Sequence, residues 1–597
     1  MRRSALLMPL AMLAVPALPI LAPSFTATAA QPANADAAFS ALSAAYIDNV
    51  ARLSPVYGTQ LGDHRFDDKL PDISAAGRAA QVAFDRKMLA DLAKIDIKAL
   101  SRDNQVDALL LKNALEYDLW DIEVLKSWSW NAQSYNDVAG SALYTLAARD
   151  FAPWPQRLKA ATARMEALPA FLLESRKRLI AAKVPEIYAT TVSRQNSGIV
   201  DIAESMLAPH ADELAPADKA RFDAALAKLK SAVADQQVWL DKTLAPAAKG
   251  DFRLGTRLYD QKMRFALMST MNRTELKAKA EKAATDARAE MYALAQQVLA
   301  GKPGAPPLPA QPTQAQRMAA IEAALELSYA QRPNRDGVMD KAKATLASAT
   351  EFVRAKDLIS LPAARVQIIT MPKFQQGVAV AYCDSPGPLD KGQDTFYAIS
   401  PIPDGWSDEQ ATSFLREYND YMIHDLSIHE AMPGHWLQID HSNQDKSMLR
   451  AVLSSGPFVE GWAVYAEGMM ADAGYMNGDP LFKLTVLKMR LRSITNTLLD
   501  IGIHTEGMSR EAAMELMTKG AFQQEREASG KWVRAQLSST QLLSYFSGYE
   551  EHMEMRAEAK RRWGASFTLK RYNDAVLSHG SPPARFVRQL VLDLPIG

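Results

Sequence analysis

The sequence predicts a large, mainly α-helical protein with a small β-sheet. Apolar residues recur at three- and four-residue intervals through most of the chain, with charged residues between them. Strand-like alternation is scarce. The 597 residues are 48% hydrophobic and 23% charged, which is ordinary for a globular protein that can bury full-sized cores. Disordered, collagen-like and fibrous proteins are therefore excluded.

Taken in order, the predicted helices and strands are well separated. The helical pattern is clearest in residues 78–96, 104–118, 155–182, 216–245, 274–299 and 338–355. Residues 365–369 and 395–399 are β-branched or aromatic and are bounded by turn residues, so they predict the two strands of the small sheet. Between these strands, the sequence that follows Cys383 (Asp384-Ser385-Pro386-Gly387) favours a turn.

The first residues have the composition of a secretory signal peptide. Arg2 and Arg3 precede a mostly apolar run, and Ala27-Thr28-Ala29 offers a small-residue cleavage site. We interpret residues 1–29 as a cleaved signal peptide and expect a periplasmic or secreted mature chain without a membrane span. A membrane anchor is the alternative, but four prolines interrupt the run, and no cysteine at its end indicates a lipoprotein.

Residues 301–316 are rich in proline and glycine and predict an irregular loop. We expect this loop to separate an N-terminal helical lobe, residues 30–300, from a second helical lobe, residues 317–597. The 68 basic and 68 acidic residues give no net charge, so the chain has no long-range field for a nucleic-acid backbone. Nucleic acid is therefore not an expected partner, and the sequence leaves the oligomeric state open.

Candidate metal ligands are concentrated in one short window. Four of the nine histidines, namely His424, His429, His435 and His441, lie within 18 residues. In a helical H-E-x-x-H motif, two histidines one turn apart bind zinc and the glutamate activates water. Here His435 follows His429 by six residues, and about 100° per residue would place the two rings on different sides of a regular helix.

Pro433 and Gly434 remove this difficulty. Proline cannot donate its backbone hydrogen bond, and glycine accepts unusual backbone angles. We therefore expect the helix to bulge or break before His435 and to bring His435 beside His429. The alternative is that these histidines cap helices or satisfy buried polar groups. We expect His424 and His441 to support the ligands from outside the metal cluster or to lie at the surface.

A third ligand is expected from a downstream helix. Glu460 and Glu467 are seven residues apart, about 700°, so they lie nearly in line on one face, with apolar residues between them. A carboxylate in apolar surroundings needs a cation or a metal. We favour Glu460 as the ligand and Glu467 as the residue that orients a histidine. The reverse assignment and an ordinary amphipathic helix with solvated glutamates are the alternatives.

These residues resemble a known family. The segments HEAMPGH (429–435) and EGWAVYAE (460–467) are similar to the hallmark of the bacterial proteins grouped as domain of unknown function 885. Further matches are Gly62-Asp63-His64-Arg65, Phe396-Tyr397, Asp500-Ile501-Gly502-Ile503-His504, Gln541 and Tyr545-Phe546-Ser547-Gly548. The chain departs from the family pattern at Lys531, where the pattern is acidic, and at Ser539, where it has proline.

The resemblance implies a helical metallopeptidase-like fold with two lobes around a cleft, distantly similar to thimet oligopeptidase and thermostable carboxypeptidase. It implies one zinc ion held by His429, His435 and Glu460, with Glu430 as the general base. Residues 317–597 would then form the catalytic lobe. The implied function is a zinc metallopeptidase for short peptides. The alternatives are a zinc hydrolase of non-peptide amides or esters and a non-catalytic zinc-containing peptide-binding protein.

Two groups of residues are expected to assist this chemistry. Tyr545 and His504 are candidate donors to the oxyanion formed during hydrolysis, although a core aromatic residue and a buried histidine are the equally simple interpretation. Arg492 and Arg556 are weaker candidates for binding a substrate carboxylate.

Overall fold

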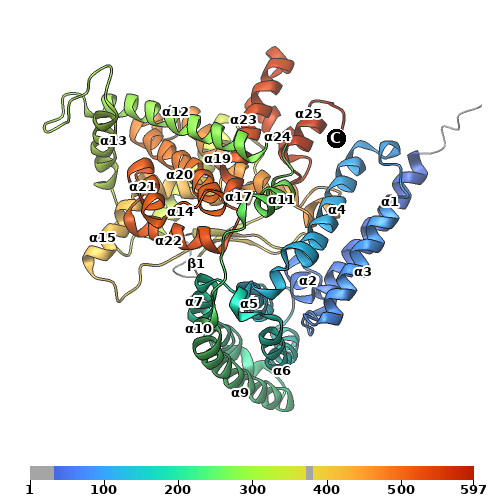
Figure 1. Cartoon of the computed structure of the whole chain (residues 1–597). Helices are drawn as coiled ribbons and strands as arrows, with labels where there is room; N and C mark the ends of the chain where they lie inside the picture. Colours follow the sequence, from blue (N-terminus) through green and yellow to red (C-terminus); the bar gives the residue numbers. More distant parts are fainter. Residues whose placement is uncertain (1–31, 372–380) are drawn as a thin grey trace, which may run out of the picture.

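The structure is a computed structural model that describes residues 32–371 and 381–597 (Figure 1). The predicted signal peptide, residues 1–29, lies outside the described residues. The chain is mainly helical with one small sheet, as predicted. Among the residues described, no helix combines the length and apolar character needed to cross a membrane.

The helices of the first half are α1 (Pro32–Leu53), α2 (Pro55–Leu61), α3 (Ala75–Leu92), α4 (Arg102–Trp120), α5 (Ala132–Ala147), α6 (Trp154–Arg178), α7 (Glu186–Gln195), α8 (Gly198–Ile202), α9 (Pro216–Trp239), α10 (Ala245–Ala247), α11 (Gly255–Leu267) and α12 (Arg273–Leu299). Of these helices, α1 to α10 run along the right and lower parts of Figure 1, α11 lies near its centre and α12 at its upper left.

The helices of the second half are α13 (Gln314–Tyr329), α14 (Val338–Lys356), α15 (Asp408–Glu417), α16 (Asp420–Glu430), α17 (His435–Ser442), α18 (Met448–Val452), α19 (Gly456–Asp472), α20 (Pro480–Thr505), α21 (Arg510–Ala521), α22 (Glu525–Leu537), α23 (Leu543–Trp563), α24 (Leu569–Leu577) and α25 (Ala584–Val591). Short 3-10 or π segments are η1 (His64–Phe66), η2 (Ile97–Ala99), η3 (Asp121–Leu125), η4 (Ser127–Ser129), η5 (Ala181–Lys183), η6 (Ala203–Leu207), η7 (Ala208–Glu213), η8 (Leu240–Leu244), η10 (Tyr475–Gly478) and η11 (Gly564–Ser566). All six predicted helical segments are confirmed, with ends that shift by a few residues.

The sheet has three strands in the order β1-β3-β2, with β1 (Val366–Thr370), β2 (Ala381–Asp384) and β3 (Thr395–Ile399). β1 runs parallel to the central strand β3, and β2 runs antiparallel to it. The first and last strands were predicted. Of the residues after Cys383 that were expected to form a turn, Ser385 to Gly387 lie outside the strands, whereas Asp384 pairs with Phe396 of β3. Pairing with a central strand overrides the turn preference of Asp384.

The proline- and glycine-rich loop was expected to separate two lobes, but the packing does not change there. α12 and α13, on either side of the loop, pack against α20 in one hydrophobic cluster that contains Leu299, Ile321 and Leu491. Both helices are amphipathic enough to bury one face on the long α20, so the loop joins neighbours within one core. One hydrophobic cluster therefore continues across residues 301–316, and the division into two lobes stays a prediction.

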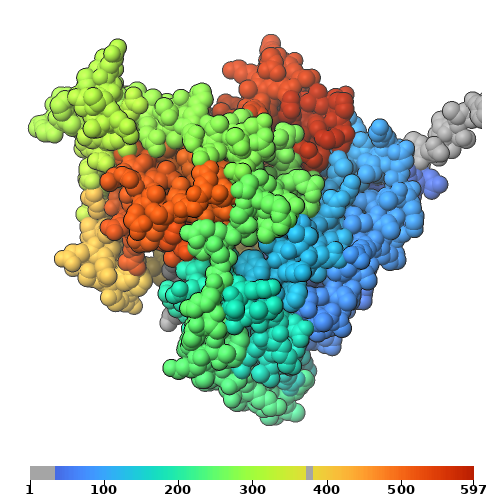
Figure 2. Space-filling view, in the orientation of Figure 1, coloured from blue at the N-terminus to red at the C-terminus, as the bar shows by residue number. Residues whose placement is uncertain are grey.

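Hydrophobic clusters other than the one around α20 are found earlier in the chain. α1, α3 and α4 form their own cluster around Leu111 and Leu115, and α5, α6 and α9 form another around Leu143. α11 contacts α4 as well as α19 and α20. Figure 2 shows the green segment that includes α11 on the surface between the blue N-terminal helices and the orange C-terminal ones.

The segment from Gly62 to Arg65, near the start of the described chain, contacts the loop between β2 and β3. His64 contacts Asp67 through Nδ1 at 3.0 Å and Asp390 of that loop through Nε2 at 3.2 Å. Gly62 has a φ of 88°, and a Cβ there would lie 2.4 Å from the backbone nitrogen of Asp390. The close approach therefore requires glycine, and it holds the β2–β3 connection against α2.

Candidate metal centre

The predicted break in the helix lies between α16 and α17. α16 ends at Glu430, and His435 is the first residue of α17. Ala431 leaves helical angles with φ −132° and ψ −79°, and the Met432–Pro433 peptide bond is cis. The backbone of Gly434 donates a hydrogen bond of 2.9 Å to the carbonyl of Ile428. The Pro-Gly pair therefore reverses the chain tightly and returns His435 to the end of α16.

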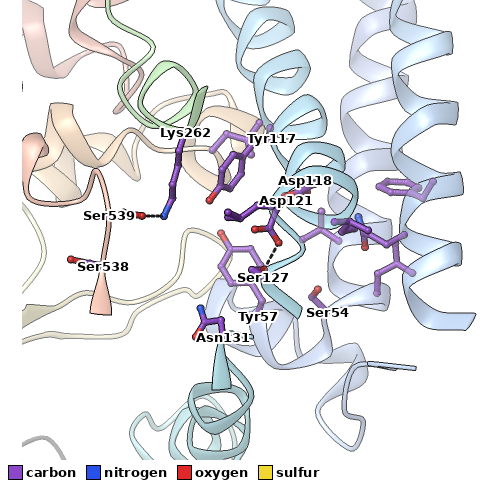
Figure 3. A pocket seen from close by; sticks show the side chains of 18 of the residues that line it. Ser54, Tyr57, Tyr117, Asp118, Asp121, Ser127, Asn131, Lys262, Ser538 and Ser539 are labelled. Atoms are coloured by element: carbon purple, nitrogen blue, oxygen red, sulfur yellow. Dashed lines mark hydrogen bonds between the residues drawn. The ribbon is translucent and has the colours of Figure 1, made fainter. Parts of the chain in front are cut away.

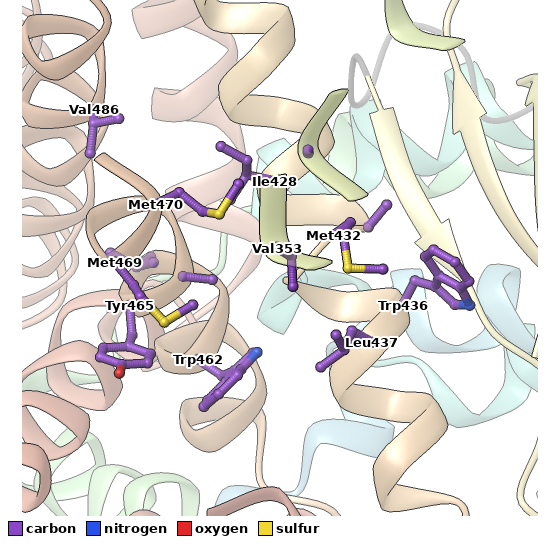
Figure 4. Packing of buried hydrophobic residues seen from close by; sticks show 14 of the residues in the cluster. Val353, Ile428, Met432, Trp436, Leu437, Trp462, Tyr465, Met469, Met470 and Val486 are labelled. Carbon is purple, nitrogen blue, oxygen red and sulfur yellow. The ribbon is translucent and has the colours of Figure 1, made fainter. Parts of the chain in front are cut away.

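Gly434 is required by a close backbone approach. A Cβ at this position would lie 2.0 Å from the carbonyl oxygen of His429. The turn is also held by Trp462 of α19, whose buried indole donates a hydrogen bond of 2.9 Å to the carbonyl of Pro433. Figure 4 shows Met432, Leu437 and Trp462 within the same buried cluster. The segment EGWAVYAE (460–467) thus packs against the helix break within the segment HEAMPGH (429–435).

Three potential ligand atoms meet at this break. One atom each from His429, His435 and Glu460 lies within 4.8 Å of the others. Oε2 of Glu460 is 3.7 Å from Nε2 of His429 and 3.5 Å from Nε2 of His435. The two rings are nearly perpendicular, at 86°. Tetrahedral zinc with ligands at 2.0–2.1 Å separates its ligand atoms by about 3.3 Å, and the two distances from Glu460 are close to that spacing.

Glu467 contacts His429 through the ring nitrogen that does not face Glu460. Its Oε1 lies 2.6 Å from Nδ1 of His429, and its side chain is 2% exposed. This contact places the proton of His429 on Nδ1 and leaves Nε2 free to bind a metal. Burial alone would lower the pKa of His429, but Glu460 and Glu467 raise it well above its usual value. The two carboxylates therefore favour positive charge at this position, as a divalent cation would supply.

Glu430 lies at the edge of the sheet. Its Oε2 accepts a hydrogen bond of 3.0 Å from the backbone N–H of Cys383 on β2. Burial raises the pKa of Glu430, while His429 and His435 oppose that effect. A carboxylate held in this way, next to the ligand cluster, is suited to accept a proton. The Cys383 side chain is partly buried, and loss of contact with water raises the pKa of its thiol, which disfavours a role as a nucleophile.

Tyr545 is brought toward the cluster by the packing of α23 on α19. Gly461 and Gly548 face each other, and a Cβ on Gly548 would lie 1.9 Å from the carbonyl oxygen of Pro457. The hydroxyl of Tyr545 accepts a hydrogen bond of 3.1 Å from Arg534. Burial raises the pKa of this tyrosine, and the charge of Glu460 raises it further.

His504 occupies a different place. Its Nε2 is 3.0 Å from the carbonyl oxygen of Ala535 and 2.8 Å from that of Ser538. Its ring stacks on Tyr259 and meets the edge of Phe252. These contacts support the C-terminal end of α22 and do not bring His504 into the ligand cluster. Of the two candidate oxyanion donors, the geometry therefore favours Tyr545.

The two arginines singled out in the sequence also have other contacts. Arg492 pairs with Glu527, and Arg556 lies over the ring of Tyr465 at 5.7 Å. Sequence reasoning did not assign a function to Lys531 or Arg534, two cations on α22. The one signal in the sequence was the departure from the family pattern at Lys531. His424 contacts Tyr475, and His441 contacts the carbonyl of Ser360, as expected for histidines outside the cluster.

A cavity of about 640 Å³ lies between the N-terminal helices and the C-terminal half (Figure 3). Tyr57, Tyr117 and Asp121 line one side, and Lys262 and Ser539 line the other, where the lysine donates a hydrogen bond of 2.7 Å to the serine. None of the ligand residues lines it. Its lining includes Leu537, the last residue of α22, the following Ser538 and Ser539, and Val452, which shortly precedes α19. Its volume is in the range of small-ligand pockets.

Fold and site together define a mainly helical protein with a candidate His-His-Glu metal centre. The chain belongs to the family described as bacterial protein of unknown function (DUF885), whose sequence profile matches residues 55–591. A "putative lipoprotein of unknown function" from Shewanella oneidensis is 34% identical, with a TM-score of 0.78, covering 93% of this chain and 99% of that one. A "putative lipoprotein" from Colwellia psychrerythraea shares the fold at 16% identity, with a TM-score of 0.69 and the same two coverages. No curated protein matches the chain.

Proposed function

We propose that this protein is an exported zinc-dependent hydrolase that cleaves short peptides. The observation that carries the proposal is the convergence of His429, His435 and Glu460, with Glu430 beside them and Glu467 on the second nitrogen of His429. A site that only stored zinc would have no use for Glu430. The cavity between the N-terminal helices and the C-terminal half is not lined by the ligand residues, but its lining reaches Ser538 and Ser539 just after α22, and its volume would accommodate a short peptide there.

The chemistry divides among the residues as follows. Zinc bound by His429, His435 and Glu460 would supply a Lewis acid that polarises the scissile carbonyl and makes water more acidic. Glu430 accepts the proton of the attacking water and delivers it to the leaving amine. The backbone N–H of Cys383 holds one carboxylate oxygen and leaves the other for this transfer.

Tyr545 would stabilise the negative charge that develops on the substrate oxygen. Arg534 donates to the phenolic oxygen, so the hydroxyl hydrogen is free to donate elsewhere. The guanidinium also withdraws charge from the phenol, which makes it a stronger donor.

Export is supported by the composition of residues 1–29 and by the lipoprotein descriptions of the two structural relatives. A lipid anchor would need a cysteine close to the apolar run. The single cysteine of this chain is Cys383, on β2, so we propose a cleaved signal peptide without a lipid anchor.

The proposal is tested with the purified mature chain, zinc analysis and a panel of short peptides, amides and esters. We expect about one zinc per chain and cleavage of peptides that a chelator abolishes. Glu430→Gln keeps the size of the side chain but removes the base, so it should retain zinc and lose most hydrolysis. Cleavage of esters or non-peptide amides alone would favour the second class of hydrolase. Zinc and peptide binding without any hydrolysis would indicate a binding protein.

A further inference from the structure

The region beside Tyr545 contains more positive charge than its neighbours neutralise. Lys488 of α20 is fully paired, since its ammonium lies 3.0 and 2.9 Å from the two carboxylate oxygens of Glu417. Arg492, one turn further along α20, pairs with Glu527 of α22. These two cations therefore have a carboxylate each.

Lys531 and Arg534, one turn apart on α22, have none. Lys531 is 6% exposed, and in residues 32–371 and 381–597 no hydrogen-bond acceptor or carboxylate contacts its ammonium group. The donors of Arg534 reach only the neutral oxygens of Gln541 and Tyr545. Residues 1–31 and 372–380 contain no aspartate or glutamate that could supply the missing partner.

The charges around Lys531 make its position costly in the free protein. Burial and the neighbouring guanidinium of Arg492 lower the pKa of the Lys531 amine well below its usual value, and Arg534 acts in the same direction. Glu527 and the metal-cluster residue Glu460 are the carboxylates that oppose them. A buried cation without a partner is unfavourable, so an anion that entered this space would be bound strongly.

We propose that Lys531, with Arg534, binds the C-terminal carboxylate of the peptide substrate, which makes the enzyme an exopeptidase acting near the C-terminus. This inference rests on the proposed peptidase function. Lys531 is close enough to Glu460 to feel its charge, and Arg534 holds the proposed oxyanion donor Tyr545. The carboxylate site therefore lies beside the scissile bond.

The experiment compares three N-acetylated peptides on the zinc-loaded protein. The first has a free C-terminal carboxylate, the second is its C-terminal amide, and the third is an amide whose last residue is glutamate. The wild type should cleave the free acid with a kcat/KM at least about tenfold above that of either amide. Equal cleavage of free acid and amide would overturn the proposal. A glutamyl amide as good as the free acid would overturn the C-terminal assignment.

Lys531→Met removes the charge and keeps an apolar chain of similar length. It should reduce the preference for the free acid to less than about threefold. Lys519→Met, on the exposed face of α21, is the control and should keep the preference of the wild type, because Lys519 is paired only with Glu515 at the surface. A preference that survives in Lys531→Met would contradict the inference.

Two further measurements distinguish a failure of the proposed role of Lys531 from a failure of the proposed hydrolase function. Because Lys531 is buried without a partner, Lys531→Met should melt at or above the temperature of the wild type, whereas a lysine with a structural role would lower it. The dissociation constants of free acid and amide are also measured on zinc-loaded Glu430→Gln, with and without Lys531→Met. If the wild type cleaves no peptide, the hydrolase proposal fails, and the ratio of these constants still decides the role of Lys531. If the free acid and the amide have equal dissociation constants, Lys531 does not bind the C-terminal carboxylate.

Discussion

Oε1 of Glu467 lies 2.6 Å from Nδ1 of His429, on the side of the imidazole that faces away from Glu460. One face of α19 therefore supplies two carboxylates to one histidine, Glu460 toward Nε2 and Glu467 toward Nδ1. His435 has no such support in the described part of the chain, since its Nδ1 is buried without a partner. The orientation of His429 thus depends on Glu467 more than that of His435 does.

The first prediction separates these two glutamates. Glu460→Gln removes a ligand and should abolish stable zinc binding, as should His435→Ala. Glu467→Gln leaves all three ligands and should weaken zinc affinity or activity by roughly 10–100-fold. Zinc content after dialysis and competition with a chelator measure both effects. If Glu467→Gln loses more zinc than Glu460→Gln, the two roles must be exchanged.

The second prediction concerns the turn before His435. In Gly434→Ala, the new Cβ would meet the carbonyl oxygen of His429 at 2.0 Å, and this oxygen belongs to the backbone and has little room to move. The turn should open, His435 should move away from His429, and zinc affinity should fall although no ligand is changed. Competition with a chelator measures the affinity.

Gly140→Ala, in the middle of α5, is the matched control. The nearest atom to its new Cβ is Cδ1 of Ile202 at 3.9 Å, an ordinary contact. This variant should keep the zinc affinity of the wild type and gain about 0.5–1 kcal/mol of helix stability. Unchanged zinc affinity in Gly434→Ala would show that the surrounding fold imposes the position of His435.

The third prediction assigns the oxyanion donor. Tyr545→Phe should lower kcat about 100- to 1000-fold with little change in KM or zinc content, because the hydroxyl acts mainly in the transition state. Tyr549→Phe, one turn further along α23, is the control for loss of a buried phenol and should keep kcat. The donor assignment fails if Tyr545→Phe reduces kcat less than about threefold.

Local rules predicted the central part of the site, but not its surroundings. The six-residue spacing of His429 and His435 is incompatible with a regular helix, so Pro433 and Gly434 had to reverse the chain, and they do. β2 was not predicted because it is only four residues long and is defined by its pairing with β3. A local sequence pattern does not show that pairing. Lys531 escaped because the absence of a partner is a property of the folded chain. A sequence shows 68 cations and cannot show which of them is left without a carboxylate.

The packing on either side of residues 301–316 could not be predicted for a similar reason. Proline and glycine in residues 301–316 indicate where helices stop, and α12 and α13 do stop there. Whether two helices share a core depends on a third element, here α20, which begins at Pro480, 164 residues beyond residue 316. Local composition carries no information about that third element.

The last prediction concerns stability and pH, through His64. Burial alone would lower the pKa of this histidine, but its contacts with Asp390 and Asp67 raise it from 6.5 to about 9. Below pH 6.5 the imidazole is protonated in both the folded and the unfolded chain, and its contribution to stability is fully present. Between pH 6.5 and about 9 only the folded chain keeps the proton, so the contribution is lost as the pH rises.

The melting temperature of the wild type should therefore fall relative to that of His64→Gln between pH 6.5 and about 9, and the difference should be constant outside that window. Glutamine keeps a hydrogen-bonding side chain but has no charge to lose. In Asp390→Asn one of the two acceptors that raise the pKa is neutral, so the window should end at a lower pH. Asp63 also acts on His64 electrostatically and stays in all three proteins. Melting curves of wild type and His64→Gln that run parallel from pH 6 to 10 would show that the charge of His64 does not hold the β2–β3 loop to α2.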